Sequence, residues 1–453
     1  MRLTLLGGSN SVMVHGISSG LCSVENITEY HNFSLGASSS LQNLHALVDN
    51  IEIAKNSDLV VTESNINDSY NVKNLAVSAD VIIKDIDLYY QILSHAAKKV
   101  LVIILPINRN HPRREADSII DCINRAHLDN IERYGLDYIN LAEIFNEIAE
   151  TELSCLMPDA RHVKPLLAHD LGKAIAHFYA TQPHCEPTPA REALDLVQQK
   201  VKVLKVADFS SLPTFERGNS KFSATLIEIS EQIKIPEQLK GYRIAGISTW
   251  GKGKIRIHNE NVEVIKQFND LKSFNEVVET LAVTDNTYIG ASNRAVTEPS
   301  INVESIEIEG DNCPCSLESL LLIKDEAQLL PNHDRKQSHN RHQIVPDIDR
   351  YIYDGKRMSL QYGSFIHRLS RYLLKEGDIE EAEKVQRVAI SANEKNAGYH
   401  MYLARLLKRR GDIEGAISSV RDAIRIDKNN KRYRYHLNVL IEEREEKAAK
   451  LSS

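Results

Sequence analysis

The segment Leu3-Thr4-Leu5-Leu6-Gly7-Gly8-Ser9-Asn10-Ser11, near the start of the chain, decides the fold that we expect for the first part of the protein. Its first four residues predict a short buried strand, and the two glycines before Ser9 predict a tight turn directly after that strand. Much further along, Pro158-Asp159-Ala160-Arg161-His162 precedes a helix-like stretch. An Asp and a His three residues apart can lie side by side, so that the carboxylate holds the imidazole tautomer that deprotonates a serine.

Strand-like and helix-like patterns alternate along residues 1–182. Short apolar runs predict buried strands, and apolar residues at helical spacing predict helices between them. The expected strands are Leu3–Leu6, Asp58–Thr62, Val100–Leu105 and Asp137–Leu141, and the expected helices are Val77–Ala97 and Glu115–Tyr134. Strands that alternate with helices are typical of a parallel sheet, so we predict a three-layer α/β domain.

A second kind of pattern begins after the proline-containing stretch Gln182–Pro189, which we interpret as a linker followed by a helix at Arg191–Val201. Residues 200–328 consist of short alternating runs separated by Gly, Asn, Asp and Lys. They predict an all-β domain of the sandwich or jelly-roll type. The expected strands are Val203–Val206, Phe222–Ile229, Tyr242–Ile247, Lys254–His258, Val262–Ile265 and Val303–Ile308.

The C-terminal part contains an internal repeat. Gly377-Asp378-Ile379-Glu380-Glu381-Ala382 recurs 34 residues later as Gly411-Asp412-Ile413-Glu414-Gly415-Ala416. The pattern resembles tetratricopeptide repeats, which are pairs of helices that stack on one another. This resemblance implies a helical repeat domain at 356–450, with a last helix at Lys431–Lys447 that caps the stack. We expect residues 329–355, which include the His-rich stretch 332–347, to be a linker.

The composition argues against several classes of protein. The formal net charge is −7, so we expect no general affinity for nucleic acid or anionic membrane, although Lys408-Arg409-Arg410 forms a local basic patch. The longest apolar run is too short to cross a bilayer. No removable apolar segment precedes the Gly-Gly-Ser turn and the six cysteines are scattered, so we predict a cytoplasmic protein with reduced thiols. Cys313-Pro314-Cys315 lacks a second pair of metal ligands, and we expect neither a metal nor a cofactor.

Two further segments offer hydrogen-bond donors for an oxyanion. Gly36 follows a short strand in Asn32-Phe33-Ser34-Leu35-Gly36, and without a side chain its backbone N–H can approach a ligand closely. In Asn65-Ile66-Asn67-Asp68, the carboxamide of Asn67 follows the strand Asp58–Thr62. Both segments are therefore expected at the sheet edge where open α/β sheets bind ligands.

These four segments, taken in chain order as Ser9, Gly36, Asn67 and the Asp159/His162 pair, resemble the SGNH (GDSL-like) hydrolase superfamily over residues 1–180. The resemblance implies that Ser9 is the nucleophile, that His162 is the general base and acid, and that Asp159 orients His162. It also implies an oxyanion hole made by the backbone N–H groups of Ser9 and Gly36 and the side chain of Asn67. The chain departs from the usual motifs twice: Gly8 stands where an Asp is usual, and Asn65 where a Gly is usual.

Simpler interpretations of the same residues stay open from the sequence. Ser11 competes with Ser9 as a nucleophile, and Asp159 could cap the helix that begins near Lys164. Asn67 and Asp68 could form a turn by bonding their own backbone. We interpret His169 as structural.

The function that we expect is a serine-dependent ester hydrolase, an acyl or acetyl esterase that acts on an acylated carbohydrate through an acyl-enzyme. Tyr242, Trp250 and Tyr288 of the β domain are candidates for stacking on sugar rings, or for packing. A first alternative is an O-acyltransferase that modifies a bacterial surface polysaccharide and would need a donor such as acetyl-CoA. A second is an inactive scaffold whose tetratricopeptide-like repeats bind a protein partner or a second copy of the chain.

Overall fold

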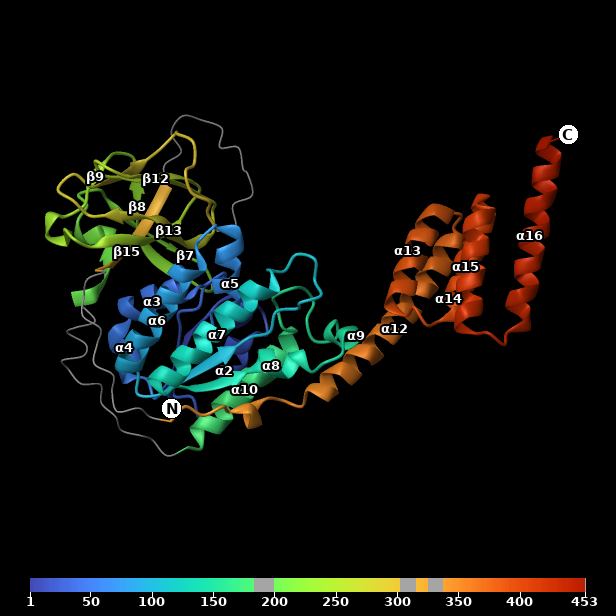
Figure 1. The fold of residues 1–453 in the computed structure, drawn as a ribbon, viewed down its shortest axis with the longest axis horizontal. Coiled ribbons are helices and arrows are strands. Elements are labelled where there is room, and N and C mark those ends of the chain that lie inside the picture. The colour runs from blue at the N-terminus through green and yellow to red at the C-terminus, as the bar shows by residue number, and fades with distance from the viewer. Residues whose placement is uncertain (183–198, 302–314, 325–336, 453) are drawn as a thin grey trace. The chain divides into compact units, whose positions relative to one another are not determined.

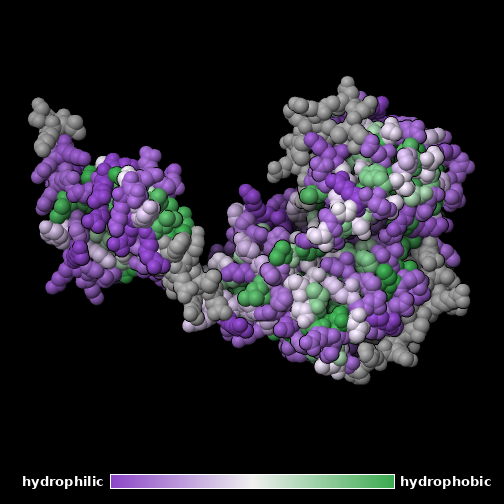
Figure 2. Space-filling view, turned by 180° about the vertical axis from the view of Figure 1, so that it is seen from behind, coloured by the Kyte–Doolittle hydropathy of each residue, from purple (hydrophilic) through white to green (hydrophobic). Residues whose placement is uncertain are grey.

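The computed structural model describes residues 1–182, 199–301, 315–324 and 337–452 of the chain. It divides into two compact units, Met1–Pro346 and Asp347–Ser453. The first unit holds one parallel sheet and two antiparallel sheets, and the second consists of helices (Figure 1). Among the described residues, no helix combines the length and the apolarity that a membrane span needs. On the face shown in Figure 2, hydrophilic residues dominate the surface and apolar residues form small patches.

A five-stranded sheet, parallel throughout, organises the N-terminal part of the first unit. Its strand order is β2-β1-β3-β4-β5, so the first strand lies inside the sheet between the second and third. The strands are β1 (Arg2–Leu6), β2 (Glu29–Asn32), β3 (Leu59–Thr62), β4 (Val100–Ile104) and β5 (Asp137–Asn140). The parallel α/β prediction is confirmed. Strand β2 has the polar sequence Glu-Tyr-His-Asn and carries no apolar pattern that would have marked its limits.

Helices cover both faces of this sheet because successive strand residues point to opposite sides. Leu6, Val60 and Val102 share one hydrophobic core with α3 and α6, whereas the other group of helices is built around α2 and α10. The helices are α1 (Ser9–Val12), α2 (Ile17–Leu21), α3 (Ser40–Asp49), α4 (Ile51–Asn56), α5 (Asn65–Asn74), α6 (Ala79–Ala96), α7 (Asp117–Tyr134), α8 (Leu141–Asn146), α9 (Glu150–Leu153) and α10 (Pro165–Ala180).

Two glycines let α2 and α10 approach each other closely. A Cβ on Gly20 would lie 1.9 Å from the carbonyl oxygen of His169, and a Cβ on Gly172 would lie 2.2 Å from that of Ile17. Neither carbonyl can move without shifting its helix. Since α2 follows the Ser9 turn and α10 follows His162, this packing brings two distant parts of the chain together.

Two antiparallel sheets complete the first unit, in agreement with the all-β character predicted for residues 200–328. The six-stranded sheet has the order β13-β10-β15-β8-β7, with β6 also paired to β15, and the four-stranded sheet has the order β12-β11-β14-β9. The strands are β6 (Val201–Lys205), β7 (Thr214–Gly218), β8 (Ser223–Ile229), β9 (Ile233–Lys234), β10 (Arg243–Trp250), β11 (Gly253–His258), β12 (Glu263–Phe268), β13 (Lys272–Ala282), β14 (Tyr288–Ala291) and β15 (Cys315–Ile323). Phe274 and Leu321 join the core of the α/β part, so the six-stranded sheet packs directly on it.

The structure differs from the sequence prediction at two connections. Residues 199–200 are helical, as predicted, but Val201, the last residue of the predicted helix, begins strand β6. The segment predicted as a linker at 329–355 contains residues that pair with the α/β sheet: Tyr138 on β5 exchanges backbone hydrogen bonds with His339 and Arg341, at 3.0 and 2.7 Å. Such a short pairing leaves no apolar pattern in the sequence. The linker at 183–189, most of the helix predicted at Arg191–Val201 and the strand predicted at Val303–Ile308 lie outside the described residues.

The second unit is a series of helices in which the sequence repeat has a structural counterpart. Gly377 and Gly411 both have left-handed backbone, with φ of 90° and 91°, and Asp378 and Asp412 both cap the helix that follows. The helices are α12 (Ile348–Lys375), α13 (Ile379–Ala392), α14 (Ala397–Arg410), α15 (Ile413–Ile426) and α16 (Lys431–Ser452). Helix α12 thus begins inside the stretch 329–355 that we predicted to be a linker.

Replacing Gly172 by Ala is expected to lower the stability of the first unit by about 2 kcal/mol or more, because the added methyl group meets backbone that cannot yield. Thermal unfolding followed by circular dichroism measures this change. Gly218→Ala is the matched control, since the nearest atom to its added Cβ lies 3.6 Å away. Equal melting temperatures for the two variants would show that the α2–α10 contact does not constrain the fold.

Candidate active site

The connections that follow three neighbouring strands at their carboxyl ends form the candidate site. Ser9 begins α1 after β1, Gly36 lies in the loop after β2, and Asn67 lies in the first turn of α5 after β3. Backbone hydrogen bonds continue the sheet into these loops: Leu35 donates to Gly7 O at 2.9 Å, and the residue after β3 donates to Leu6 O at 3.2 Å. Strand order changes direction at β1, which is where open α/β sheets leave a crevice for ligands.

Ser9, His162 and Asp159 form a continuous hydrogen-bonded chain. The Ser9 Oγ lies 2.8 Å from His162 Nε2, although the two residues are 153 positions apart. On the other side of the ring, His162 Nδ1 lies 2.8 and 3.0 Å from the two carboxylate oxygens of Asp159. A carboxylate only accepts, so Nδ1 carries the proton, and Nε2 presents its lone pair to the Ser9 hydroxyl. This is the arrangement that a general base needs.

Asp159 is held as a carboxylate. Partial burial raises its pKa, but hydrogen bonds from the backbone N–H of Arg161 and from the His162 side chain and backbone outweigh that effect and bring the pKa below its ordinary value. The two backbone bonds measure 2.8 and 2.9 Å. The capping role that the sequence left open is not what the structure shows, since α10 begins at Pro165 without a side-chain cap.

Asn10 fastens the serine turn to the histidine segment. Its Nδ2 donates to the carbonyl of Arg161 at 3.0 Å, and its Oδ1 accepts from the backbone N–H of Val163 at 2.9 Å. These two backbone groups flank His162 on either side. Asn10 is 2% exposed, so water does not compete with the contact. One amide side chain therefore fixes the position of the imidazole relative to the serine next to it.

Glu63 lies beneath the serine turn. Its Oε1 accepts from the backbone N–H of Gly8 at 2.6 Å and from the Ser11 hydroxyl at 2.9 Å. Burial raises the pKa of Glu63 to about 7 in spite of these hydrogen bonds. Ser11 is fully buried and engaged with Glu63, whereas the half-buried Ser9 meets His162. The geometry therefore favours Ser9 over Ser11 as the nucleophile.

The position of the Asn67 side chain explains why residue 8, before Ser9, is a glycine. A Cβ on residue 8 would lie 2.4 Å from Asn67 Nδ2, so a side chain at Gly8 would displace the amide. The same Nδ2 donates one hydrogen to the carbonyl of Ser38 at 2.9 Å, which ties the Asn67 amide to the Gly36 loop and leaves its second hydrogen for another acceptor. Asp68 accepts from the backbone and hydroxyl of Ser40, at 2.8 Å each, rather than forming a local turn.

The second departure from the usual motifs also has a structural role. The Asn65 side chain is completely buried and pairs with the backbone of Leu105, accepting from its N–H at 3.0 Å and donating to its carbonyl at 2.9 Å. It therefore joins the loop after β3 to the loop after β4, where a glycine could not.

Two of the predicted oxyanion donors are backbone N–H groups. Among the described residues, no hydrogen bond engages the N–H of Ser9 or of Gly36. Nothing lies within 4 Å of the position that a Cβ on Gly36 would take, so there is room beside this backbone. The structure thus brings together all of the residues predicted for catalysis and for the oxyanion hole around one sheet edge.

A carboxyl group from the β domain supports the segments that follow β2 and β3, which we call the loop cluster. Glu276 on β13 is fully buried; it accepts from the Ser39 hydroxyl and from Asn71 Nδ2, the latter at 2.8 Å. Ser39 directly follows the Ser38 carbonyl that holds Asn67. Burial raises the pKa of Glu276 to about 8, and the charge of Asp85 raises it further while the two hydrogen bonds lower it.

A second serine–histidine contact lacks the features of the first. His169 Nδ1 lies 2.9 Å from Ser19 Oγ, but the Ser19 hydroxyl donates its proton to the Gly16 carbonyl at 2.8 Å. The ring therefore donates to the serine instead of accepting from it. This geometry fits the structural role that we expected for His169.

The remaining candidates do not form a second site. Tyr242 and Trp250 are buried in packing, with the Tyr242 hydroxyl bonded to the Gln199 carbonyl at 2.6 Å, so neither presents a ring to a sugar. Tyr288 is half-buried and stacks on His258. Cys313 and Pro314 lie outside the described residues, and Cys315 is buried in β15. In the described parts of the chain, no group of three or more His, Cys, Asp or Glu side chains could hold a metal ion.

Sequence reasoning missed Asn10, Glu63 and Glu276. Asn10 lies next to the predicted serine turn and Glu63 at the end of β3, so the sequence could have placed both residues near the site. Their partners were not, because each bonds to backbone that is distant in sequence. Glu276 carried no signal, since it lies in the middle of a strand of another domain.

Replacing Asn10 by Ala is expected to slow covalent labelling of Ser9 by a fluorophosphonate probe by about 10²-fold, because the imidazole loses its fixed position. Mass spectrometry of the labelled peptide measures the rate. Asn56→Ala removes an exposed amide whose bond stays within its own helix and should label at the wild-type rate. If a folded Asn10→Ala variant were labelled at the wild-type rate, the role of Asn10 in positioning His162 would be contradicted.

Replacing Glu276 by Gln should change the pH dependence of stability. The pKa of Glu276 is about 8 in the folded protein against an ordinary value of 4.5, so folding favours the protonated form. This contribution is complete below pH 4.5 and is lost as pH rises through about 8. Glu276→Gln keeps the acceptor but cannot ionise, so its melting temperature should fall less than that of the wild type between pH 5 and 9. The exposed Glu279→Gln is the control, and parallel curves for wild type and Glu276→Gln would contradict the assignment.

Comparisons with known proteins find only remote likenesses. No protein-family model and no curated protein matches the sequence. Similar solved structures include a lipase/acylhydrolase from Enterococcus faecalis, with 15% identity, a TM-score of 0.34 and coverage of 41% of this chain and 100% of its own. The acetyl xylan esterase AlAXEase has 17% identity, a TM-score of 0.33 and coverage of 40% and 100%. An acetylxylan esterase from Geobacillus stearothermophilus has 13% identity, a TM-score of 0.30 and coverage of 41% and 96%. The matched region is the N-terminal part of this chain.

Proposed function

We propose that the first unit is a serine-dependent ester hydrolase in which Ser9 is the nucleophile. The observation that carries the proposal is the unbroken hydrogen-bonded chain from Ser9 through His162 to Asp159, with 2.8 Å at each of its two links. A hydroxyl whose proton points at a neutral imidazole, itself oriented by a carboxylate, is prepared for attack on a carbonyl carbon.

In the acylation step, Ser9 Oγ forms a bond to the ester carbonyl carbon while His162 Nε2 takes the hydroxyl proton. The carbonyl oxygen becomes an oxyanion, and the imidazole becomes an imidazolium that Asp159 stabilises. The tetrahedral intermediate then breaks its bond to the alcohol oxygen, which receives the proton from Nε2. The products of this step are a free alcohol and an acyl group on Ser9.

The oxyanion hole that we propose consists of the backbone N–H groups of Ser9 and Gly36 and the second amide hydrogen of Asn67. Loss of one such donor typically costs about 10²–10³-fold in turnover.

In the second step, deacylation, water gives a proton to His162 and attacks the acyl carbon. Ser9 leaves with that proton, and the carboxylic acid product is released. The reaction requires neither a cofactor nor a metal.

The substrate class that we propose is an acylated carbohydrate, such as an O-acetylated saccharide. Its support is the resemblance of the serine, glycine, asparagine and histidine segments to SGNH hydrolases. The buried Tyr242 and Trp250 give no support to a carbohydrate substrate.

The two departures from the usual motifs favoured the alternative of an inactive scaffold. In the structure, however, Gly8 makes room for Asn67 and Asn65 joins the segments after β3 and β4, so both departures are compatible with an intact site.

Ser9→Ala is expected to reduce hydrolysis of p-nitrophenyl acetate by at least about 10³-fold, since in the described parts of the chain no other hydroxyl is hydrogen-bonded to His162. The matched control is Ser19→Ala, which removes the serine that contacts His169 and should leave the rate unchanged. Equal rates for wild type and Ser9→Ala would overturn the proposed nucleophile.

Transfer to another hydroxyl is distinguished from hydrolysis with an isotope-labelled acetyl donor. Wild-type enzyme is incubated with labelled p-nitrophenyl acetate and, separately, with labelled acetyl-CoA, each in the presence of an oligosaccharide acceptor. Mass spectrometry then compares labelled oligosaccharide with labelled acetate. Faster labelling of the oligosaccharide would show an acyltransferase.

A further inference from the structure

Strand β13 places a carboxyl group among apolar side chains, on the face that packs on the α/β part. Residues two apart on a strand point to the same side of the sheet. Phe274 and Val278 both pack into the core that the sheet shares with the α/β part, and the buried Glu276 stands between them. The Phe274 ring also lies against His45 of α3, with ring centroids 5.1 Å apart. The Glu276 side chain therefore points toward the α/β part and away from the core of the β domain.

Stability alone does not account for an acid at this position. A carboxyl group that leaves water loses its solvation, whereas an apolar side chain of the same size would gain free energy from the same burial. Burial raises the pKa of Glu276 to about 8 in spite of its two hydrogen bonds, so the site disfavours the charged form. The residues that this carboxyl group holds therefore indicate its role.

Both hydrogen bonds of Glu276 end on segments that carry proposed oxyanion donors. Its Oε1 accepts from Ser39 Oγ, and from Asn71 Nδ2 at 2.8 Å. Ser39 caps the start of α3, three residues after Gly36. Asn71 lies one helical turn after Asn67 on α5. Since both bonds reach the same oxygen, the proton of the neutral acid can sit on Oε2 without breaking either of them.

The turn that carries Gly36 ends directly before Ser39. The N–H and the Oγ of Ser38 both donate to the Leu35 carbonyl, at 3.2 and 2.7 Å, and close the turn. Inside it, Ala37 has left-handed backbone with a φ of 62°, a conformation that residues with a side chain seldom adopt. Such a conformation persists only where surrounding contacts hold it. The bond from Ser39 to the β domain is one of these contacts.

Ser38 also carries the link to the second donor. Its carbonyl accepts from Asn67 Nδ2 at 2.9 Å. Asn67 is thus tied to Glu276 along two paths, through Ser38 and Ser39 on one side and through Asn71 on its own helix. A change at the one carboxyl group would therefore move both donors relative to the nucleophile.

We propose that Glu276 is a positioning residue of the esterase, which holds the Gly36 turn and the Asn67 amide in place for the oxyanion. The β domain is thereby a working part of the catalytic centre. The inference rests on the proposed function, because it concerns the oxyanion hole of that reaction. A displacement of about 1 Å at a reacting group can cost about 10²-fold in rate, so the effect of Glu276 is expected on turnover.

Glu276→Met keeps most of the side-chain volume and removes the acceptor. In the full chain it should lower kcat and kcat/KM for p-nitrophenyl acetate by similar factors of at least about ten, because the donors meet an oxyanion only in the transition state. Rates are divided by the fraction of Ser9 that a fluorophosphonate probe labels at completion, so that unfolded protein is not counted. Glu276→Gln restores an acceptor and should recover most of the loss.

The matching thionoester, in which sulfur replaces the carbonyl oxygen, separates positioning from a general loss of packing. Sulfur is a weak hydrogen-bond acceptor, so its reaction gains little from the oxyanion hole. The ratio of the ester rate to the thionoester rate should therefore fall in Glu276→Met and return toward the wild-type ratio in Glu276→Gln.

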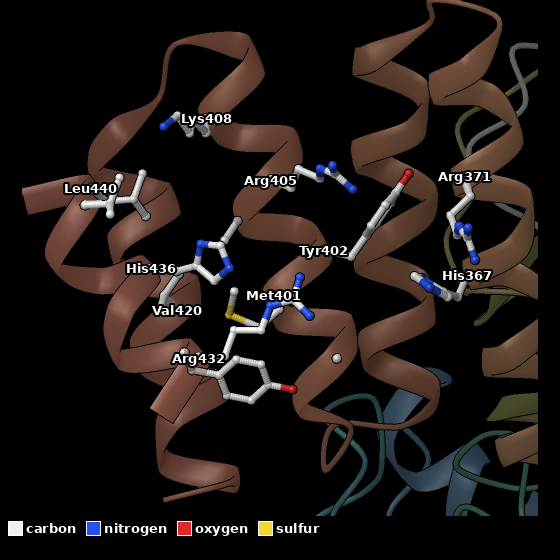
Figure 3. A pocket seen from close by; sticks show the side chains of 14 residues that line it. His367, Arg371, Met401, Tyr402, Arg405, Lys408, Val420, Arg432, His436 and Leu440 are labelled. Atoms are coloured by element: carbon white, nitrogen blue, oxygen red, sulfur yellow. The ribbon is translucent and has the colours of Figure 1, made fainter. Parts of the chain in front are cut away.

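Two control variants should keep the wild-type rate and ratio. Ser319→Ala removes another buried hydrogen bond from the same sheet to α3, the 2.8 Å contact with His45, so it should lower the melting temperature alone. Arg405→Ala changes an exposed side chain that lines a cavity among the helices of the second unit (Figure 3).

Wild-type turnover per labelled site in Glu276→Met would overturn the inference, and so would equal falls in the ester and thionoester rates. Ser39→Ala removes the same hydrogen bond from the α3 side and provides the test if Glu276→Met does not fold; unchanged turnover there overturns the inference as well. Failure of the proposed function is seen separately, since the wild type would then show no hydrolysis that Ser9→Ala abolishes, and the inference would fail with it.

Discussion

The candidate site depends on the close contact between α2 and α10. Ser9 lies eight residues before α2 and His162 three residues before α10, so this contact brings the segments that carry the hydroxyl and the imidazole close together. Gly20 and Gly172 allow backbone to meet backbone at this contact. Asn10 then adjusts the final position by bonding the backbone on both sides of His162. Packing brings the segments together, and one amide fixes their register.

Buried carboxyl groups support the other half of the site. Glu63 holds the turn before Ser9, and Glu276 holds the segment after Ser38. Both are fully buried with a raised pKa, because burial disfavours the charged form more than their hydrogen bonds favour it. Glu276 comes from the six-stranded sheet, which shares a hydrophobic core with the α/β part. The β domain thus contributes to the architecture of the loop cluster, a placement that the sequence had left open.

The sequence determined the parts of the fold that depend on local pattern. Apolar runs marked β1, β3, β4 and β5, and the repeat of Gly-Asp marked two equivalent helix ends, because left-handed backbone and helix capping have strong residue preferences. It misplaced the limits of β2, which is polar, and it missed residues 339–341, whose pairing with β5 involves only backbone atoms. Short polar segments carry no periodicity from which pairing could be predicted.

The same division holds for the site. The sequence by itself determined which residue types follow the strands, which made Ser9, Gly36 and Asn67 candidates. The spacing of Asp159 and His162 before a predicted helix made that pair candidates as well. Only the tertiary structure decided between Ser9 and Ser11, because the choice depends on which hydroxyl is buried against Glu63 and which meets His162. It also decided that Tyr242 and Trp250 are packing residues and that Glu276 reaches the loop cluster. These facts depend on contacts between segments far apart in the chain, and such contacts are set by packing rather than by local sequence.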